Sequence, residues 1–234
     1  MVSFPKWSLL ALCLWCAVGS SYSVIFTTTC LKMEENYNFD ETKYLGTWYE
    51  VRRLYDPSDP EQEDCVVMNY KAGEKGHYDI LQSYQITEEG SPIYVSGVAE
   101  PEVFENSKVP KFLERYNTTK NSEPDGHVEI VAINYDSYAI VYSCISINAS
   151  HYTESARVLS RQTQLNNRDT DVVTLFLESH FKRSEHKWRA TKQTADFCKP
   201  SLVEVADEKS RSQSARLPTE IHLIAMLLIA KMLY

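Results

Sequence analysis

Between positions 48 and 160 the chain alternates short runs of apolar, aromatic and β-branched residues with clusters of turn-forming residues. Such runs are typical of β-strands, which bury alternate side chains on one face. The links are mostly of hairpin length, so we expect an all-β, up-and-down antiparallel barrel that closes and removes its exposed edges. The pattern predicts eight strands, at Trp48–Leu54, Cys65–Lys71, Tyr78–Ile86, Ile93–Glu100, Pro110–Tyr116, His127–Tyr135, Tyr138–Ile147 and Ser155–Ser160.

Two of these strands alternate clearly enough to predict which side chains share one face of the sheet. The residues predicted to share a face are Val66, Met68 and Tyr70 in the second strand, and Val128, Ile130 and Ala132 in the sixth. A register error of one residue would turn a whole strand over, so these faces are a sharp test of the fold.

After the last strand the apolar period changes from that of a strand to that of a helix. The apolar positions are Val172, Val173, Phe176, Leu177 and Phe181. They predict an amphipathic α-helix from about Thr170 to Arg183 that lays one face on the barrel wall. Asp169 or Asp171 near its start and Lys182–Arg183 at its end suit the helix dipole. Beyond the helix, Trp188–Thr194 can add a ninth short strand.

Residues 1–21 have the composition of a secretory signal peptide. They contain one lysine, an apolar run from Trp7 to Val18 and a stretch of small residues after it. The run is shorter than the ~20 residues that span a bilayer, which argues against an N-terminal anchor. The folded domain is then expected to occupy residues 22–200.

Residues 201–234 combine a polar spacer with an apolar tail, Ile221–Ala230, that is too short to cross a bilayer as a stable helix. Small residues, a spacer of ~8–12 residues and such a tail are the signal for GPI attachment, in which the tail is removed. Ser210 or Ser212 stands at the right distance to carry the anchor. The alternative is an amphipathic terminal helix that docks on the protein or on a membrane surface.

The chain has six cysteines, two of which fall in the predicted signal peptide; the others are Cys30, Cys65, Cys144 and Cys198. Four cysteines in a secreted protein predict two disulfides, and the residues alone allow three pairings. Their intervals match no zinc-binding spacing, so no metal site is expected. Sequons at Asn117 and Asn148 fit passage through the secretory pathway and predict glycosylated surface positions.

Composition excludes some classes of function. With 24 Lys+Arg against 32 Asp+Glu, the formal net charge is −8, which is unsuited to binding nucleic acid by neutralising phosphates. The sequence also lacks the glycine-rich motifs that bind nucleotide phosphates, and no cofactor is expected.

Three segments, in chain order, resemble the motifs of the lipocalin family. Residues 43–50 read KYLGTWYE, with G-x-W before the first strand; residues 134–144 read NYDSYAIVYSC, at the turn between the sixth and seventh strands; residues 159–161 read LSR. The likeness covers roughly residues 30–198 and is greatest for the group that contains apolipoprotein D and insect Lazarillo. Asn134 departs from the second motif, which normally has an acidic residue there. In some lipocalins this region helps to contact a receptor, and the change at Asn134 weakens that inference here. The fold need not suffer, because Asn can still form hydrogen bonds within the turn.

The resemblance implies an eight-stranded calyx, open at one end, that carries a small hydrophobic ligand such as a fatty acid, sterol or retinoid. It implies the disulfides Cys30–Cys144 and Cys65–Cys198. It also implies that Arg161 stacks on Trp48 at the closed end, in a structural role. Some members of the group are GPI-linked neuronal surface glycoproteins. The resemblance therefore implies a place on the extracellular face of the plasma membrane, or secretion, and a role in neuronal development or in lipid and oxidative-stress protection.

Alternation and the resemblance together nominate a ligand-binding wall. Its candidate residues are Met68, Tyr70, Tyr78, Ile80, Gln82, Tyr84, Gly97, Ala99, Phe112 and Val128. The small residues Gly97 and Ala99 are expected to leave volume beside the aromatic side chains. The alternative is that these side chains pack on one another and fill the barrel.

Arg157 is a further candidate, because it stands where the resemblance places a pocket-lining tryptophan. Facing inward, its guanidinium would need a carboxylate such as Glu50 or an anionic ligand headgroup, which would favour acidic lipids over neutral sterols. A local bulge would instead turn Arg157 outward into solvent, and this is the arrangement that we favour from sequence.

Catalysis is not expected. All four cysteines of the predicted mature chain should be paired, no Ser/His/Asp set has supporting spacing, and Glu61, Glu63 and Asp64 fit a solvated loop. The alternative to a carrier is a cell-surface adhesion or signalling glycoprotein that uses the barrel as a scaffold for a protein partner. The open-end loops, residues 55–64 and 117–125, would serve either function.

Overall fold

The structure is a computed structural model that describes residues 25–32, 39–54, 63–88, 90–102, 110–117, 126–183 and 186–203. The predicted signal peptide, Ser210, Ser212, the apolar tail and most of both open-end loops lie outside these residues. Within the described ranges, no helix has the length and apolar character needed to cross a membrane.

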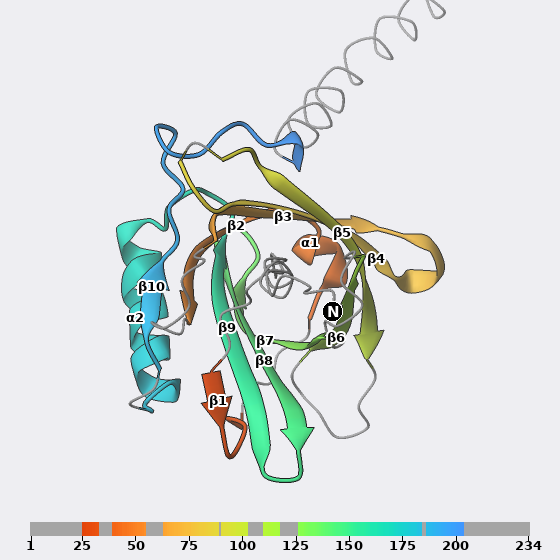
Figure 1. Ribbon diagram of the computed structural model, residues 1–234, viewed down its shortest axis with the longest axis vertical. Coiled ribbons are helices and arrows are strands. Elements are labelled where there is room, and N and C mark those ends of the chain that lie inside the picture. Colours follow the sequence, from red (N-terminus) through yellow and green to blue (C-terminus); the bar gives the residue numbers. More distant parts are fainter. Residues whose placement is uncertain are drawn as a thin grey trace, which may run out of the picture.

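The barrel consists of β2 (Gly46–Leu54), β3 (Asp64–Ala72), β4 (Tyr78–Gln85), β5 (Ile93–Glu102), β6 (Lys111–Tyr116), β7 (Gly126–Asn134), β8 (Tyr138–Asn148) and β9 (His151–Ser160). Each strand is antiparallel to the next in the chain, and β9 also pairs with β2, which closes the ring. Figure 1 shows this ring of strands. The predicted eight-stranded antiparallel barrel is confirmed, and every strand overlaps its predicted range.

Two short strands extend the sheet beyond the ring. β1 (Ile25–Thr27) pairs with β9, and β10 (Trp188–Ala190) pairs with β2. The predicted ninth strand is therefore present but ends at Ala190, since the following residues turn toward β3, where Cys65 N donates to Lys192 O at 2.8 Å. Two short helical turns, α1 (Glu41–Tyr44) and the 3₁₀ turn η1 (Glu74–Gly76), complete the links between strands.

Helix α2 (Asn167–His180) lies outside the barrel wall (Figure 1). Its buried side chains Val173 and Leu177 pack with outward-facing residues of β8 and β9, among them Ile140 and Val158.

The helix begins before the predicted start because Asn166 is its N-cap, accepting a hydrogen bond from Asp169 N at 2.9 Å. It also ends before Lys182–Arg183, at His180. Val172 was expected on the apolar face, and this was wrong: it is 45% exposed, because the buried stripe is the narrower one through Val173 and Leu177.

A β-bulge changes one of the two predicted strand faces. Pairing between β7 and β8 shifts between Ile130 and Ala132, where an extra residue interrupts the alternation. Val128 and Ile130 lie inside the barrel, whereas Ala132 packs with the cluster under α2. The prediction that Ala132 shares their face is therefore wrong.

Candidate functional site

The two ends of the barrel are built differently. At one end α1 lies against the interior, where Tyr44 packs on the rings of Trp48, Tyr70 and Phe112 at centroid distances of 5.5, 5.0 and 6.2 Å. Trp48 is completely buried and donates its indole N–H to Tyr44 O at 2.8 Å. We call this the capped end. The opposite end, at which the β8–β9 turn lies, is called the far end.

Arg161 seals the capped end from outside. Its guanidinium stacks on Trp48 with its carbon 3.6 Å from the ring centroid. It also donates to the carbonyl oxygens of Thr47 at 2.9 Å and Lys43 at 2.7 Å, which belong to β2 and α1. The implied contact between Trp48 and Arg161 is present, and its role is to hold segments of backbone together.

Strand register places the nominated wall residues inside the barrel. Residues opposite one another in adjacent strands share a face. The matched sets are Met68, Gln82 and Val95; Tyr70, Ile80 and Gly97; Tyr78, Ala99 and Glu114; and Phe112 with Val128. Tyr84 packs with Val66 and Val95 on the same inner face. All ten nominated residues are buried.

Gly97 does not leave the volume that its size suggested. A Cβ at this position would lie 2.6 Å from Arg115 O and 2.9 Å from Tyr116 Cδ1, distances that no real Cβ tolerates. Strand β6 and the ring of Tyr116 therefore occupy the space over Gly97. Ala99 is likewise 1% exposed and packed in the core, so the expectation of open volume beside these two residues was wrong.

Arg157 faces the interior, contrary to the outward orientation expected from sequence. The bulge lies on β2, between Glu50 and Arg52, and not on β9, so the alternation of β9 is preserved through Arg157. Its Nη2 atom forms an ion pair with Glu114 at 3.6 Å, and its Nη1 donates to Met68 Sδ at 3.5 Å. The side chain is 18% exposed.

Glu114 is the functional-site residue that sequence reasoning missed. It is 4% exposed, and its two carboxylate oxygens accept hydrogen bonds from the hydroxyls of Tyr70 and Tyr116, each at 2.9 Å. Alternation from Phe112 along β6 could have placed it on the inner face.

The buried carboxylate of Glu114 shifts the pKa of its neighbours. Burial alone would lower the pKa of Arg157, but the neighbouring Tyr116 and Glu114 outweigh it and raise that pKa. Burial, together with Glu114, holds the pKa of Tyr70 well above its usual value. Arg157 is therefore firmly cationic and Tyr70 firmly neutral.

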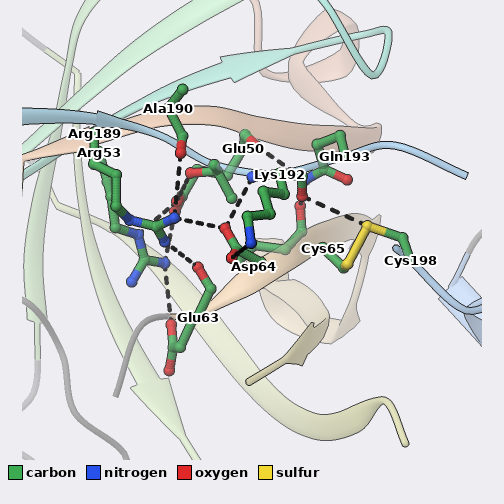
Figure 2. Close-up of polar contacts among 12 residues, drawn as sticks. Glu50, Arg53, Glu63, Asp64, Cys65, Arg189, Ala190, Lys192, Gln193 and Cys198 are labelled. Carbon is green, nitrogen blue, oxygen red and sulfur yellow. Dashed lines mark hydrogen bonds and ion pairs between the residues drawn. A yellow bond between two sulfur atoms is a disulfide. The ribbon is translucent and has the colours of Figure 1, made fainter. Parts of the chain in front are cut away.

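A second buried ionic cluster joins β2, β3 and the C-terminal segment (Figure 2). Arg53 donates to Glu50 through Nε at 2.6 Å and to Glu63 through Nη2 at 3.0 Å. Glu50 is completely buried and accepts a further hydrogen bond from Thr191 Oγ1 at 2.6 Å. The carboxylate expected to partner Arg157 is thus held by Arg53. Burial raises the pKa of Glu63, even though Arg53 acts in the opposite direction.

The prediction of a solvated acidic loop was wrong for Glu63 and Asp64, and Glu61 lies outside the described residues. Glu63 is 3% and Asp64 4% exposed. Asp64 accepts from Arg189 Nη1 at 2.6 Å and from Lys192 N at 2.8 Å (Figure 2). The acids are buried because the C-terminal segment, far away in sequence, covers them.

The disulfides pair as the resemblance implies. Cys30–Cys144 joins the N-terminal arm to β8, and Cys65–Cys198 joins β3 to the C-terminal segment (Figure 2). These four cysteines are thereby oxidised, which fits an oxidising compartment. Within the described ranges, no cluster of three His, Cys, Asp or Glu side chains suits a metal ion.

Both sequon asparagines are exposed. Asn117 follows β6 directly, and Asn148 begins the β8–β9 turn. Asn148 Oδ1 accepts from Ser150 N at 3.0 Å, so the tip of the hairpin presents the side chain in a defined turn. The motif variant Asn134 also forms a turn contact, accepting from Asp136 N at 3.2 Å.

Comparison with known proteins identifies the family. The model of the lipocalin / cytosolic fatty-acid binding protein family matches residues 45–189. The chain belongs to the lipocalin family. Among its lipocalin relatives, apolipoprotein D of Macaca fascicularis is 30% identical over 61% of this chain and 71% of that protein. For apolipoprotein D of Bos taurus the identity is 30%, over 55% of this chain and 64% of that protein.

The chain is also similar to a more distant relative and, in fold, to solved structures. Lazarillo protein of Schistocerca americana is 24% identical over 69% of this chain and 73% of that protein. Insecticyanin from the tobacco hornworm Manduca sexta superimposes with a TM-score of 0.57 at 21% identity, over 76% of this chain and 93% of that one. Lobster apocrustacyanin A1 superimposes with a TM-score of 0.54 at 21% identity, over 67% of this chain and 81% of that one.

Proposed function

We propose that the protein is a carrier that binds one small hydrophobic molecule inside its barrel. Family membership supports this proposal, and so does the inner wall, which combines aromatic and aliphatic side chains with a few polar groups. The observation that carries it is the exposure of Arg157. Its side chain faces inward and is 18% exposed, so solvent reaches this part of the inner wall.

Disulfide pairing favours carriage over covalent catalysis by this chain. A cysteine nucleophile requires a free thiolate, and Cys30, Cys65, Cys144 and Cys198 are all in disulfides. The ionic groups inside the barrel are paired with one another, which suits a binding wall of fixed shape.

Tryptophan fluorescence tests the proposal, because Trp48 lies at the capped end of the interior whereas Trp188 packs on the outer wall near Phe181. The protein purified without residues 1–21 is titrated with fatty acids, sterols and retinoids. It keeps Trp48 and Trp188, so a Trp188→Phe variant isolates Trp48. We expect saturable quenching with one-to-one stoichiometry in both proteins. A flat response to every class, on protein with both disulfides formed, contradicts the carrier proposal.

We further propose that the carrier stands on the extracellular face of the plasma membrane through a GPI anchor at Ser210 or Ser212, with glycans at Asn117 and Asn148. Exposure of both asparagines and the two disulfides support an extracellular setting. There it would serve neuronal development or protection of lipids against oxidative stress. Release of the protein from intact cells by phosphatidylinositol-specific phospholipase C tests the anchor. Retention on the cells after treatment, or secretion without any surface pool, contradicts it.

A further inference from the structure

Gln82 holds a buried oxygen without a partner on the inner wall. The residue is 2% exposed, and its register opposite Met68 and Val95 directs its side chain into the barrel. Among the described residues, Gln82 Oε1 has no hydrogen-bond partner. An unsatisfied buried acceptor has lost its hydration without compensation, so a ligand that supplies a donor at this point removes a penalty present in the empty protein.

The buried charged groups on β2, β6 and β9 are unfavourable to an anionic ligand. Arg157 is paired with Glu114, at 3.6 Å. Arg53 is paired with both Glu50 and Glu63, at 2.6 and 3.0 Å. These two guanidinium groups face three carboxylates, so this set carries one excess negative charge.

The adjacent pair of Asp64 and Arg189, at 2.6 Å, is neutral and does not change this balance. A carboxylate entering the barrel would lose its hydration and find the two guanidinium groups of the set already bound to acids. The sequence suggested that an inward Arg157 would favour acidic lipids. Because Glu114 already pairs with Arg157, this preference is no longer expected.

We propose that the ligand is a neutral molecule whose hydroxyl donates to Gln82 Oε1, and that Gln82 makes the barrel select alcohols over carboxylic acids with the same apolar tail. This inference rests on the proposed function, since it specifies the chemistry of the molecule carried. The apolar tail lies toward the aromatic residues of the capped end, among them Tyr44, Trp48 and Phe112.

Matched ligand pairs test the selectivity. Retinol is compared with retinoic acid, and tetradecanol with tetradecanoate, by quenching of Trp48 at neutral pH, where both acids are ionised. We expect each alcohol to bind at least tenfold more tightly than its acid. Equal or tighter binding of the acids overturns the inference while leaving the carrier proposal intact. Failure of all four to bind the folded, disulfide-bonded protein overturns both.

A Gln82→Leu variant tests the assigned role, with Gln164→Leu on the exposed surface as the matched control. Leucine removes the unpaired oxygen at similar volume, so we expect the empty variant to be as stable as the wild type or more stable. Its alcohol affinity should fall about tenfold and its acid affinity should change less than twofold. An unchanged alcohol-to-acid ratio, or a parallel loss of both affinities, shows that Gln82 has no selective role.

Discussion

Arg161 connects three backbone segments at the capped end with one side chain. Its planar guanidinium covers Trp48 and at the same time donates to carbonyl oxygens of α1, β2 and the β7–β8 turn, the last through Tyr135 O at 3.0 Å. A lysine ammonium is a point charge and cannot both stack and reach oxygens that lie in different directions.

Replacing Arg161 by lysine should therefore destabilise the barrel although the charge is conserved. We expect Arg161→Lys to lower the free energy of unfolding by about 2 kcal/mol, the range for losing hydrogen bonds from a charged group. Urea denaturation measures it, with the exposed Arg168→Lys as control, for which a change within about 0.5 kcal/mol is expected. Equal effects of the two substitutions contradict this role.

Glu63 should give stability a pH dependence of defined sign. Burial raises its pKa in the folded protein above the ordinary value of 4.5, so the folded state holds the proton more tightly than the unfolded state. Its contribution to stability is then complete below about 4.5 and is lost as pH rises through the folded pKa. Relative to Glu63→Gln, the wild type should lose unfolding free energy between pH 4 and pH 7.

Urea denaturation at several pH values between 4 and 7 checks this sign. The exposed Glu178→Gln provides the control, and its difference from the wild type should hardly vary with pH. A difference between wild type and Glu63→Gln that grows in favour of the wild type as pH rises contradicts the dominance of burial over the attraction of Arg53.

At the scale of elements, alternation predicts strands well until a bulge interrupts it. Eight strands were predictable because runs of apolar, aromatic and β-branched residues are separated by clusters of turn-forming residues. The face of Ala132 was not predictable, because the bulge on β7 inserts one residue and reverses the face without leaving a sequence signal. Arg157 keeps the inward face that alternation along β9 gives it, because the nearby bulge lies on β2. Val172 is exposed because only a narrow stripe of α2 is buried against the barrel wall. The width of that stripe depends on the contact with the wall, which the sequence does not show.

Gly97 tests the packing of β5 against β6. Because a Cβ would lie 2.6 Å from a backbone oxygen, Gly97→Ala should lower the free energy of unfolding by about 1–3 kcal/mol, as overpacking does. Gly126→Ala is the matched control, since its nearest contact is 3.9 Å away. Thermal unfolding compares the two. If Gly97→Ala is no worse than Gly126→Ala, the space over Gly97 is open after all.

At the scale of the whole molecule, the C-terminal segment completes the barrel. Its Arg189 pairs with Asp64 and its Cys198 forms a disulfide with Cys65 (Figure 2). Its Thr191 donates a hydrogen bond to Glu50. The sequence therefore predicts a solvated loop at Glu63 and Asp64, because the groups that bury them come from more than a hundred residues away. The disulfide pairing was open from the residues alone and followed only from the family resemblance.

Blocking the interior tests most directly whether the ligand binds inside the barrel. Ser143 faces inward, opposite Val128 and Ser155, whereas Ser146 on the same strand is exposed. Ser143→Trp places a tryptophan side chain in the interior, whereas Ser146→Trp adds the same side chain outside the barrel.

Native mass spectrometry then counts retinol bound to the wild type, Ser143→Trp and Ser146→Trp, each with both disulfides formed. We predict one retinol per chain in the wild type and in Ser146→Trp, and none in Ser143→Trp. Stoichiometric binding to the blocked variant would place the ligand outside the barrel and contradict the account.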